Sequence, residues 1–195
     1  MAQNNVSKYK MVVIGGSAGA LEIVLGITAQ LPPQSQCTFV IVLHRKTGME
    51  SLLTNLVMAK TTLPVIEIED KENIRPGTIY LAPPDYHLLF ERDETFSLDS
   101  SEKINFSRPS IDVTFESAAE IYGSAVIGVL LSGANADGAE GLRKIKLSGG
   151  CTIVQNPQTA DVSFMPQQAL LKTKADAVVD GENIGELISK MIRMK

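Results

Sequence analysis

The sequence is poor in the residues that build disulfide frameworks and thiolate metal sites. Its 195 residues include two cysteines, two histidines and no tryptophan. Cys37 and Cys151 lie far apart and form no C-x-x-C pair, which argues against a disulfide framework and a zinc-thiolate site. We therefore expect two reduced cysteines, no zinc-thiolate site and, by default, a cytoplasmic location.

Charge and hydropathy argue against two further classes. Lysine and arginine number 18 against 22 acidic residues, a net charge of −4, with no basic cluster. Nucleic-acid binding is not expected, because neutralising phosphates requires clustered cations. No apolar run approaches the ~18 residues of a spanning helix, so membrane insertion is not expected either. Residues 1–10 are polar and predict a disordered or extended segment, followed by one domain over 11–195.

Short apolar runs alternate with helical patterns along the chain. This alternation predicts an α/β fold with a single doubly wound, mostly parallel sheet and flanking helices. Strands are expected at residues 11–14, 39–43, 65–68, 127–131, 152–154 and 177–179. Helices are expected at about 20–30, 49–59, 111–122 (capped by Ser110), 139–148, 165–171 and 183–194.

The middle of the chain departs from this alternation. Residues 78–82 and 87–91 flank Pro83-Pro84-Asp85-Tyr86, a pattern that predicts an antiparallel hairpin near residues 78–91. The following stretch, 91–107, is polar, and we expect an exposed excursion there.

A glycine-rich turn ends the first apolar run, and two chemistries use such a turn. Gly15-Gly16-Ser17-Ala18-Gly19 can be a phosphate-binding loop or, as Gly-x-Ser-x-Gly, a nucleophile elbow. A dinucleotide site typically has an acidic residue at the end of the second strand, where this chain has His44-Arg45. The hydrolase interpretation is therefore favoured. An NADP- or flavin-binding Rossmann-like domain, with Arg45 near a 2′-phosphate, is the alternative.

Three residues at predicted strand ends complete a hydrolase site. If the first strand is central, Ser17, His44 and Asp137 converge at the carboxyl edge of the sheet. A serine hydroxyl becomes nucleophilic when an imidazole removes its proton, and a carboxylate orients that imidazole. We therefore expect Ser17 as nucleophile, His44 as base and Asp137 as the orienting acid. His87 is the other imidazole and is expected to line the same cleft.

Several separated motifs resemble one known family, the CheB protein-glutamate methylesterases of chemotaxis, in its catalytic domain. They cover residues 11 to 180 and comprise Val-Ile-Gly-Gly-Ser-Ala-Gly (13–19), Ile-Val-Leu-His (41–44), Tyr-Leu-Ala-Pro-Pro-Asp-Tyr-His (80–87), Arg-Pro-Ser-Ile-Asp (108–112), Gly-Val-Leu-Leu-Ser-Gly (128–133), Ala-Asp-Gly-Ala (136–139) and Met-Pro (165–166).

The resemblance implies a serine hydrolase that removes methyl esters from glutamates on the cytoplasmic helices of chemoreceptors, and that also deamidates glutamine. The family's nucleophile, base and carboxylate fall on Ser17, His44 and Asp137. Arg108 and Met165, which lie in shared motifs, are expected to line the substrate cleft with His87. The resemblance implies neither a metal nor an organic cofactor. Members usually carry a receiver domain that is not part of these 195 residues, so a separate or fused regulatory domain is an expected partner.

The loop residues around the expected site differ from the family pattern. Backbone N–H groups of Ala18 and Ala134 are the expected oxyanion donors. The family usually has Ser-Thr-Gly-Gly where this chain has Ser17-Ala-Gly-Ala20, and Thr-Gly-Met-Gly where it has Ser132-Gly-Ala-Asn135. A catalytically weak regulatory relative is therefore a second alternative to an active esterase.

Overall fold

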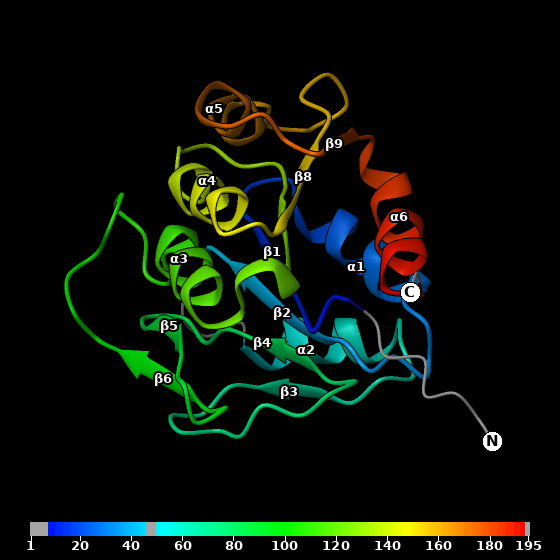
Figure 1. Cartoon of the computed structure of the whole chain (residues 1–195), viewed down its shortest axis with the longest axis vertical. Coiled ribbons are helices and arrows are strands. Elements are labelled where there is room, and N and C mark those ends of the chain that lie inside the picture. The colour runs from blue at the N-terminus through cyan, green and yellow to red at the C-terminus, as the bar shows by residue number, and fades with distance from the viewer. Residues whose placement is uncertain (1–7, 46–49, 194–195) are drawn as a thin grey trace.

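A seven-stranded parallel sheet forms the centre of the molecule (Figure 1). The computed structural model describes residues 8–45 and 50–193. The strand order is β3-β4-β2-β1-β7-β8-β9. These strands are β1 (Met11–Gly16), β2 (Thr38–Leu43), β3 (Val65–Glu67), β4 (Ile79–Leu81), β7 (Val126–Leu130), β8 (Cys151–Gln155) and β9 (Ala177–Val179).

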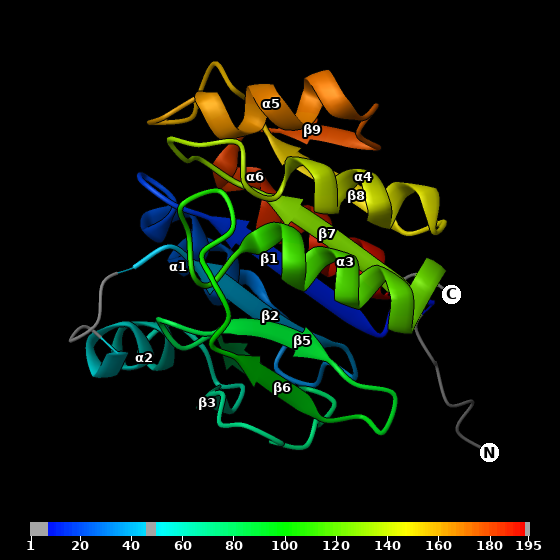
Figure 2. The same ribbon diagram turned by 90° about the vertical axis from the view of Figure 1, so that its left-hand side faces the viewer.

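Six helices cover the two faces of this sheet in the described part of the chain (Figure 2). They are α1 (Leu21–Gln30), α2 (Glu50–Met58), α3 (Ile111–Tyr122), α4 (Ala139–Leu147), α5 (Phe164–Lys172) and α6 (Gly181–Arg193), with a short 3₁₀ helix, η1 (Gly123–Ala125). Each predicted helix is confirmed, including the Ser110 cap, whose hydroxyl accepts from the N–H of Val113. The predictions for residues 1–7, 46–49 and 194–195 lie outside the described residues.

The central strand is β1, as the sequence predicts. It pairs with β2 on one side and β7 on the other, with Gly16 beside Leu43 and Gly15 beside Leu130. The chain first builds the half of the sheet on the β2 side of β1, with β3 at the edge and β4 between β3 and β2, and then returns to build the other half from β7. This reversal of strand order creates a crevice at the carboxyl ends of the strands, where doubly wound sheets bind ligands.

The strands are apolar on both faces because helices cover both. In β1, Val12 and Ile14 pack into the core that includes residues of α1, α2 and α6. Met11 and Val13 pack into the opposite core, with residues of α3, α4 and α5. All four side chains are at most 1% exposed, which explains why these strands read as continuous hydrophobic runs.

Gly15 allows α3 to approach the end of β1 closely. A Cβ atom at this position would lie 2.4 Å from Cγ2 of Ile111, the first residue of α3. Any larger residue would push the helix away from the sheet. The glycine therefore places the N-terminus of α3 directly over the carboxyl end of the central strand.

The predicted pairing of residues 78–82 with 87–91 is wrong. Ile79–Leu81 joins the parallel sheet between β3 and β2, and its three side chains are fully buried. The antiparallel partner of β5 (His87–Phe90) is β6 (Phe96–Asp99), inside the stretch expected to be an excursion. Phe96 anchors this second sheet, because its ring packs against Tyr80 and Phe90 at centroid distances of 4.9 and 5.3 Å.

Candidate active site

A histidine–aspartate pair spans the end of the central strand. His44 follows β2 and Asp137 follows β7, the two neighbours of β1. Nε2 of His44 lies 2.7 Å from Oδ2 of Asp137, whose side chain is fully buried. The structure therefore brings two of the three predicted catalytic residues into direct contact.

The start of α3 binds the Asp137 carboxylate. Oδ1 accepts hydrogen bonds from the Ser110 hydroxyl at 2.8 Å and the Asp112 N–H at 3.0 Å, while Oδ2 accepts from the Ile111 N–H at 2.7 Å. Burial by itself raises the pKa of Asp137, but the hydrogen bonds from His44 and from these backbone groups outweigh burial and lower the pKa below its usual value. Asp137 is consequently ionised at neutral pH.

The orientation of the His44 ring follows from this charge. An ionised Asp137 only accepts, so Nε2 of His44 carries a proton, and Nδ1 is the ring nitrogen that Asp137 does not contact. Nδ1 lies 3.3 Å from the hydroxyl of Ser107, which in turn accepts from Nδ2 of Asn135 at 3.2 Å. No sequence pattern indicated Ser107, which directly precedes the Arg-Pro-Ser motif.

Ser17 lies beside this pair without bonding to it. Its N–H donates to the Ser132 carbonyl at 2.9 Å, and the His44 N–H donates to the Gly16 carbonyl at 3.2 Å. These bonds fix the turn after β1 between the ends of β2 and β7. Within the described residues, the half-buried Ser17 has no hydrogen bond from its hydroxyl to His44. Gly19, with φ of 77°, allows the chain to turn into α1.

Two loops next to Ser17 present backbone N–H groups without protein acceptors. In the described part of the chain, the N–H groups of Ala18 and Ala134 donate no hydrogen bond. Both loops are nevertheless well anchored, since the Ser132 hydroxyl donates to the Ala18 carbonyl at 2.7 Å and the Gly133 N–H donates to the Val162 carbonyl at 3.1 Å. Available donors on fixed loops are what an oxyanion site requires.

A cavity of about 420 Å³ opens beside the imidazole. It is lined by His44, Arg45, Asp85, Lys103, Phe106, Ser107 and Arg108. Reciprocal backbone bonds between Ile104 and Ser107 close a tight turn, in which Asn105 and Phe106 have φ of 50° and 63°. This left-handed backbone, unusual for phenylalanine, leaves the Phe106 side chain 96% exposed at the rim and places Ser107 against His44. Of the three predicted cleft residues, Arg108 is the one that lines this cavity.

His87 and Met165 do not line open space in this structure. His87 is 1% exposed, and its Nδ1 accepts from the Ser110 N–H at 3.1 Å while Nε2 donates to the Glu102 carbonyl at 2.9 Å. Met165 is fully buried beneath Gly133, where a Cβ atom would lie 2.5 Å from the methionine methyl group. The prediction that both residues line the substrate cleft is wrong. His87 instead binds the backbone at Ser110 and Glu102, and Met165 packs against the loop at Gly133.

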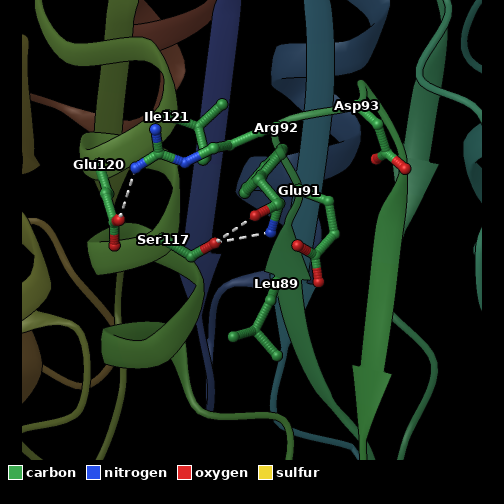
Figure 3. A pocket seen from close by; sticks show the side chains of 8 residues that line it. Leu89, Glu91, Arg92, Asp93, Ser117, Glu120 and Ile121 are labelled. Carbon is green, nitrogen blue, oxygen red and sulfur yellow. Dashed lines mark hydrogen bonds and ion pairs between the residues drawn. The ribbon is translucent and has the colours of Figure 1, made fainter.

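A second cavity, of about 410 Å³, lies between β5 and the C-terminal half of α3 (Figure 3). Arg92 and Glu120 form an ion pair at 3.5 Å across it, and the Ser117 hydroxyl accepts from the Phe90 N–H at 2.6 Å. It contains no histidine and lies at the other end of α3 from Asp137. This cavity is separate from the candidate active site.

Residues 8–45 and 50–193 contain neither a metal-binding cluster nor a membrane-spanning helix. No group of three His, Cys, Asp or Glu side chains in this part of the chain is arranged to hold a metal ion. No helix there is long and apolar enough to span a bilayer.

Comparison with known proteins identifies the family. The CheB methylesterase family model matches residues 12–188. The chain belongs to the CheB methylesterase family. A protein of Leptospira interrogans that carries the provisional name protein-glutamate methylesterase/protein-glutamine glutaminase is 44% identical over 183 residues, covering 94% of this chain and 95% of its own.

A Thermotoga maritima protein of the CheB family, named protein-glutamate methylesterase/protein-glutamine glutaminase, is 36% identical over 186 residues. This chain spans 54% of that protein's length. The crystal structure of the Thermotoga CheB methylesterase catalytic domain superposes with a TM-score of 0.90, at 36% identity, covering 94% of this chain and 99% of that one. Membership of the CheB family confirms the predicted α/β fold and does not favour the dinucleotide-binding alternative.

Proposed function

We propose that this protein is a serine hydrolase that removes γ-methyl esters from glutamate residues of chemoreceptors and deamidates glutamine at equivalent positions. The observation that carries the proposal is the His44–Asp137 pair, at 2.7 Å, over the end of the central strand of a CheB-family domain. The names of the Leptospira and Thermotoga relatives supply the substrate class.

Ser17 is the nucleophile in the proposed reaction. Nδ1 of His44, the ring nitrogen that Asp137 leaves free, takes the Ser17 proton as Oγ attacks the ester carbonyl. His44 then gives that proton to the departing methanol. Water, deprotonated in turn by His44, hydrolyses the glutamyl-serine ester and regenerates Ser17. Asp137 stabilises the imidazolium in both steps without taking the proton itself.

The loops beside Ser17 would stabilise the tetrahedral intermediates. The N–H groups of Ala18 and Ala134 have no protein acceptor in the described residues and are the proposed oxyanion donors. The adjacent N-terminus of α1 adds a positive dipole end. One such donor contributes about 3 kcal/mol of transition-state stabilisation in other serine hydrolases.

Methanol release from methylated receptor tests the proposal. We expect Ser17→Ala and His44→Gln each to lower kcat/KM on the order of a thousandfold or more, because nucleophile and base act as a unit. The matched control is Ser124→Ala. Ser124 is an exposed serine in η1, which directly precedes the N-terminal end of β7, and this variant should retain wild-type activity.

Ser107→Ala distinguishes the two hydroxyls near the imidazole. Ser107, not Ser17, lies within 3.3 Å of Nδ1 in this structure. Activity that survives Ser17→Ala but is abolished by Ser107→Ala would transfer the nucleophile to Ser107. If the wild-type protein releases no methanol, a non-catalytic regulatory relative of the family would be the better description of this protein.

A further inference from the structure

Three buried donor atoms beside His44 have no acceptor. They are Nε and Nη1 of Arg45 and Nε of Arg108, and in the described part of the chain they are the only buried side-chain nitrogen or oxygen atoms without a hydrogen-bond partner. Both arginines line the 420 Å³ cavity that includes His44. Leaving charged donors buried and unpaired costs free energy. Two such residues from separate segments at one cavity therefore indicate an anionic occupant.

Each guanidinium is anchored on one side only. Nη2 of Arg45 donates to Glu67 at 3.2 Å and to the Ala82 carbonyl at 3.0 Å, and the Arg45 side chain is 9% exposed. Nη1 of Arg108 donates to the carbonyls of Ser100 and Ser101, both at 2.7 Å. These contacts fix the two groups in place while Nε and Nη1 of Arg45 and Nε of Arg108 stay unsatisfied.

The charge of the cavity favours an anion. Its lining has three cations, Arg45, Lys103 and Arg108, against one acid, Asp85, although the chain as a whole has a net charge of −4. Glu67 compensates part of the Arg45 charge from outside the lining. Lys103 and Phe106, which both line the cavity, are exposed to solvent.

We propose that this cavity is a carboxylate subsite that binds an acidic side chain of the substrate polypeptide, next to the ester being hydrolysed. The inference rests on the proposed function. Its location supports a substrate carboxylate over an unrelated anion, because His44 lies on the wall of the cavity. Side chains four residues apart on a helix lie about 5–6 Å from each other. An acid one helical turn from the esterified glutamate can therefore reach the arginines while the ester occupies the site at Ser17.

Two helical peptides test the subsite. Each carries one glutamate γ-methyl ester at its centre, flanked four residues away on both sides by glutamate in one peptide and by glutamine in the other. Binding is measured to Ser17→Ala protein, so that no turnover occurs. We expect the acidic peptide to bind roughly tenfold more tightly at low ionic strength, the range of a charge-assisted hydrogen bond.

Substitutions then assign the preference to residues. In the Ser17→Ala background, Arg45→Gln should reduce the ratio of the two dissociation constants to near one. Lys103→Gln, at an exposed position where we expect folding to be unchanged, should reduce the ratio in part. Arg92→Gln is the matched control, since Arg92 is 84% exposed and lines the other cavity. Its ratio should equal that of the parent protein.

The outcomes separate the subsite from the proposed function. Equal dissociation constants for the two peptides overturn the subsite, as does a preference that Arg45→Gln and Lys103→Gln both leave intact. Methanol release from the glutamine-flanked peptide by wild-type protein reports on the esterase independently. A protein that binds the acidic peptide preferentially but hydrolyses neither peptide supports the subsite and contradicts the proposed function.

Discussion

Asp112 makes the stability of this domain fall as the pH rises through weakly acidic values. The side chain is 8% exposed, and burial, followed by repulsion from Asp137 and Glu116, raises its pKa from 3.8 to about 6 despite a hydrogen bond from the Gly141 N–H at 2.7 Å. The folded protein therefore holds a proton on Asp112 that the unfolded chain has released between these two pH values. The protonated Asp112 makes its full contribution to the unfolding free energy below pH 3.8, and this contribution is lost as the pH rises to about 6.

The magnitude follows from the two pKa values. One pKa unit corresponds to about 1.4 kcal/mol, so a rise from 3.8 to about 6 makes the ionised carboxylate cost the folded state about 3 kcal/mol. In Asp112→Asn this cost is absent at every pH. We expect the unfolding free energy of the variant, minus that of the wild type, to increase by about 2 kcal/mol between pH 4 and pH 7, since Asp112 of the unfolded chain is already partly ionised at pH 4.

Urea unfolding followed by circular dichroism at several pH values measures this difference. Any constant offset from exchanging a carboxylate for an amide, including a changed bond to Asn105, shifts the whole curve and leaves its slope intact. The control is Asp93→Asn, a fully exposed residue whose pKa is lowered by its bond to Thr95, so its difference curve should be flat over this range. A flat curve for Asp112→Asn would refute the reasoning.

Two further predictions concern the hydroxyl that caps α3 and the two thiols. Ser110→Ala should lower the unfolding free energy by about 1–2 kcal/mol, because the hydroxyl both donates to Asp137 and accepts from the Val113 N–H; urea unfolding that matches wild type contradicts this. Iodoacetamide should modify Cys151 well before Cys37, since burial raises the pKa of Cys37 to about 12 and leaves it 1% exposed, whereas Cys151 is partly exposed. Mass spectrometry showing Cys37 modified first contradicts the described packing.

Most of the parallel sheet was predictable because burial on both faces makes each strand a continuous apolar run. The hairpin was mispredicted for a physical reason. Pro83-Pro84 directly follows Ile79–Leu81, where the turn of a hairpin would be expected. Phe96, which anchors β6, the true partner of β5, lies in a stretch of mostly polar residues. Its burial depends on Tyr80 and Phe90, contacts between segments that no local pattern encodes.

The candidate site was predictable to the extent that strand ends determine it. His44 and Asp137 meet because β2 and β7 both neighbour β1, a consequence of topology. Ser107 reaches His44 through two consecutive residues with left-handed backbone, and neither of them is glycine. Such a turn has little sequence signature, so Ser107 and the cavity beyond it required the structure. The proposed role of Ser17 stays a prediction until the serine variants are assayed.

The contact between Asp137 and Nε2 of His44 has a consequence for recognising hydrolases by shape. In the chymotrypsin arrangement the carboxylate contacts Nδ1, and Nε2, the nitrogen farther from the backbone, faces the serine. Here the two nitrogens exchange places: Nε2 contacts Asp137, and Nδ1, the nitrogen nearer the main chain, faces the hydroxyl of Ser107. A three-dimensional template that specifies atom names will overlook this domain. One that specifies only a carboxylate, either ring nitrogen and a nearby hydroxyl will find it.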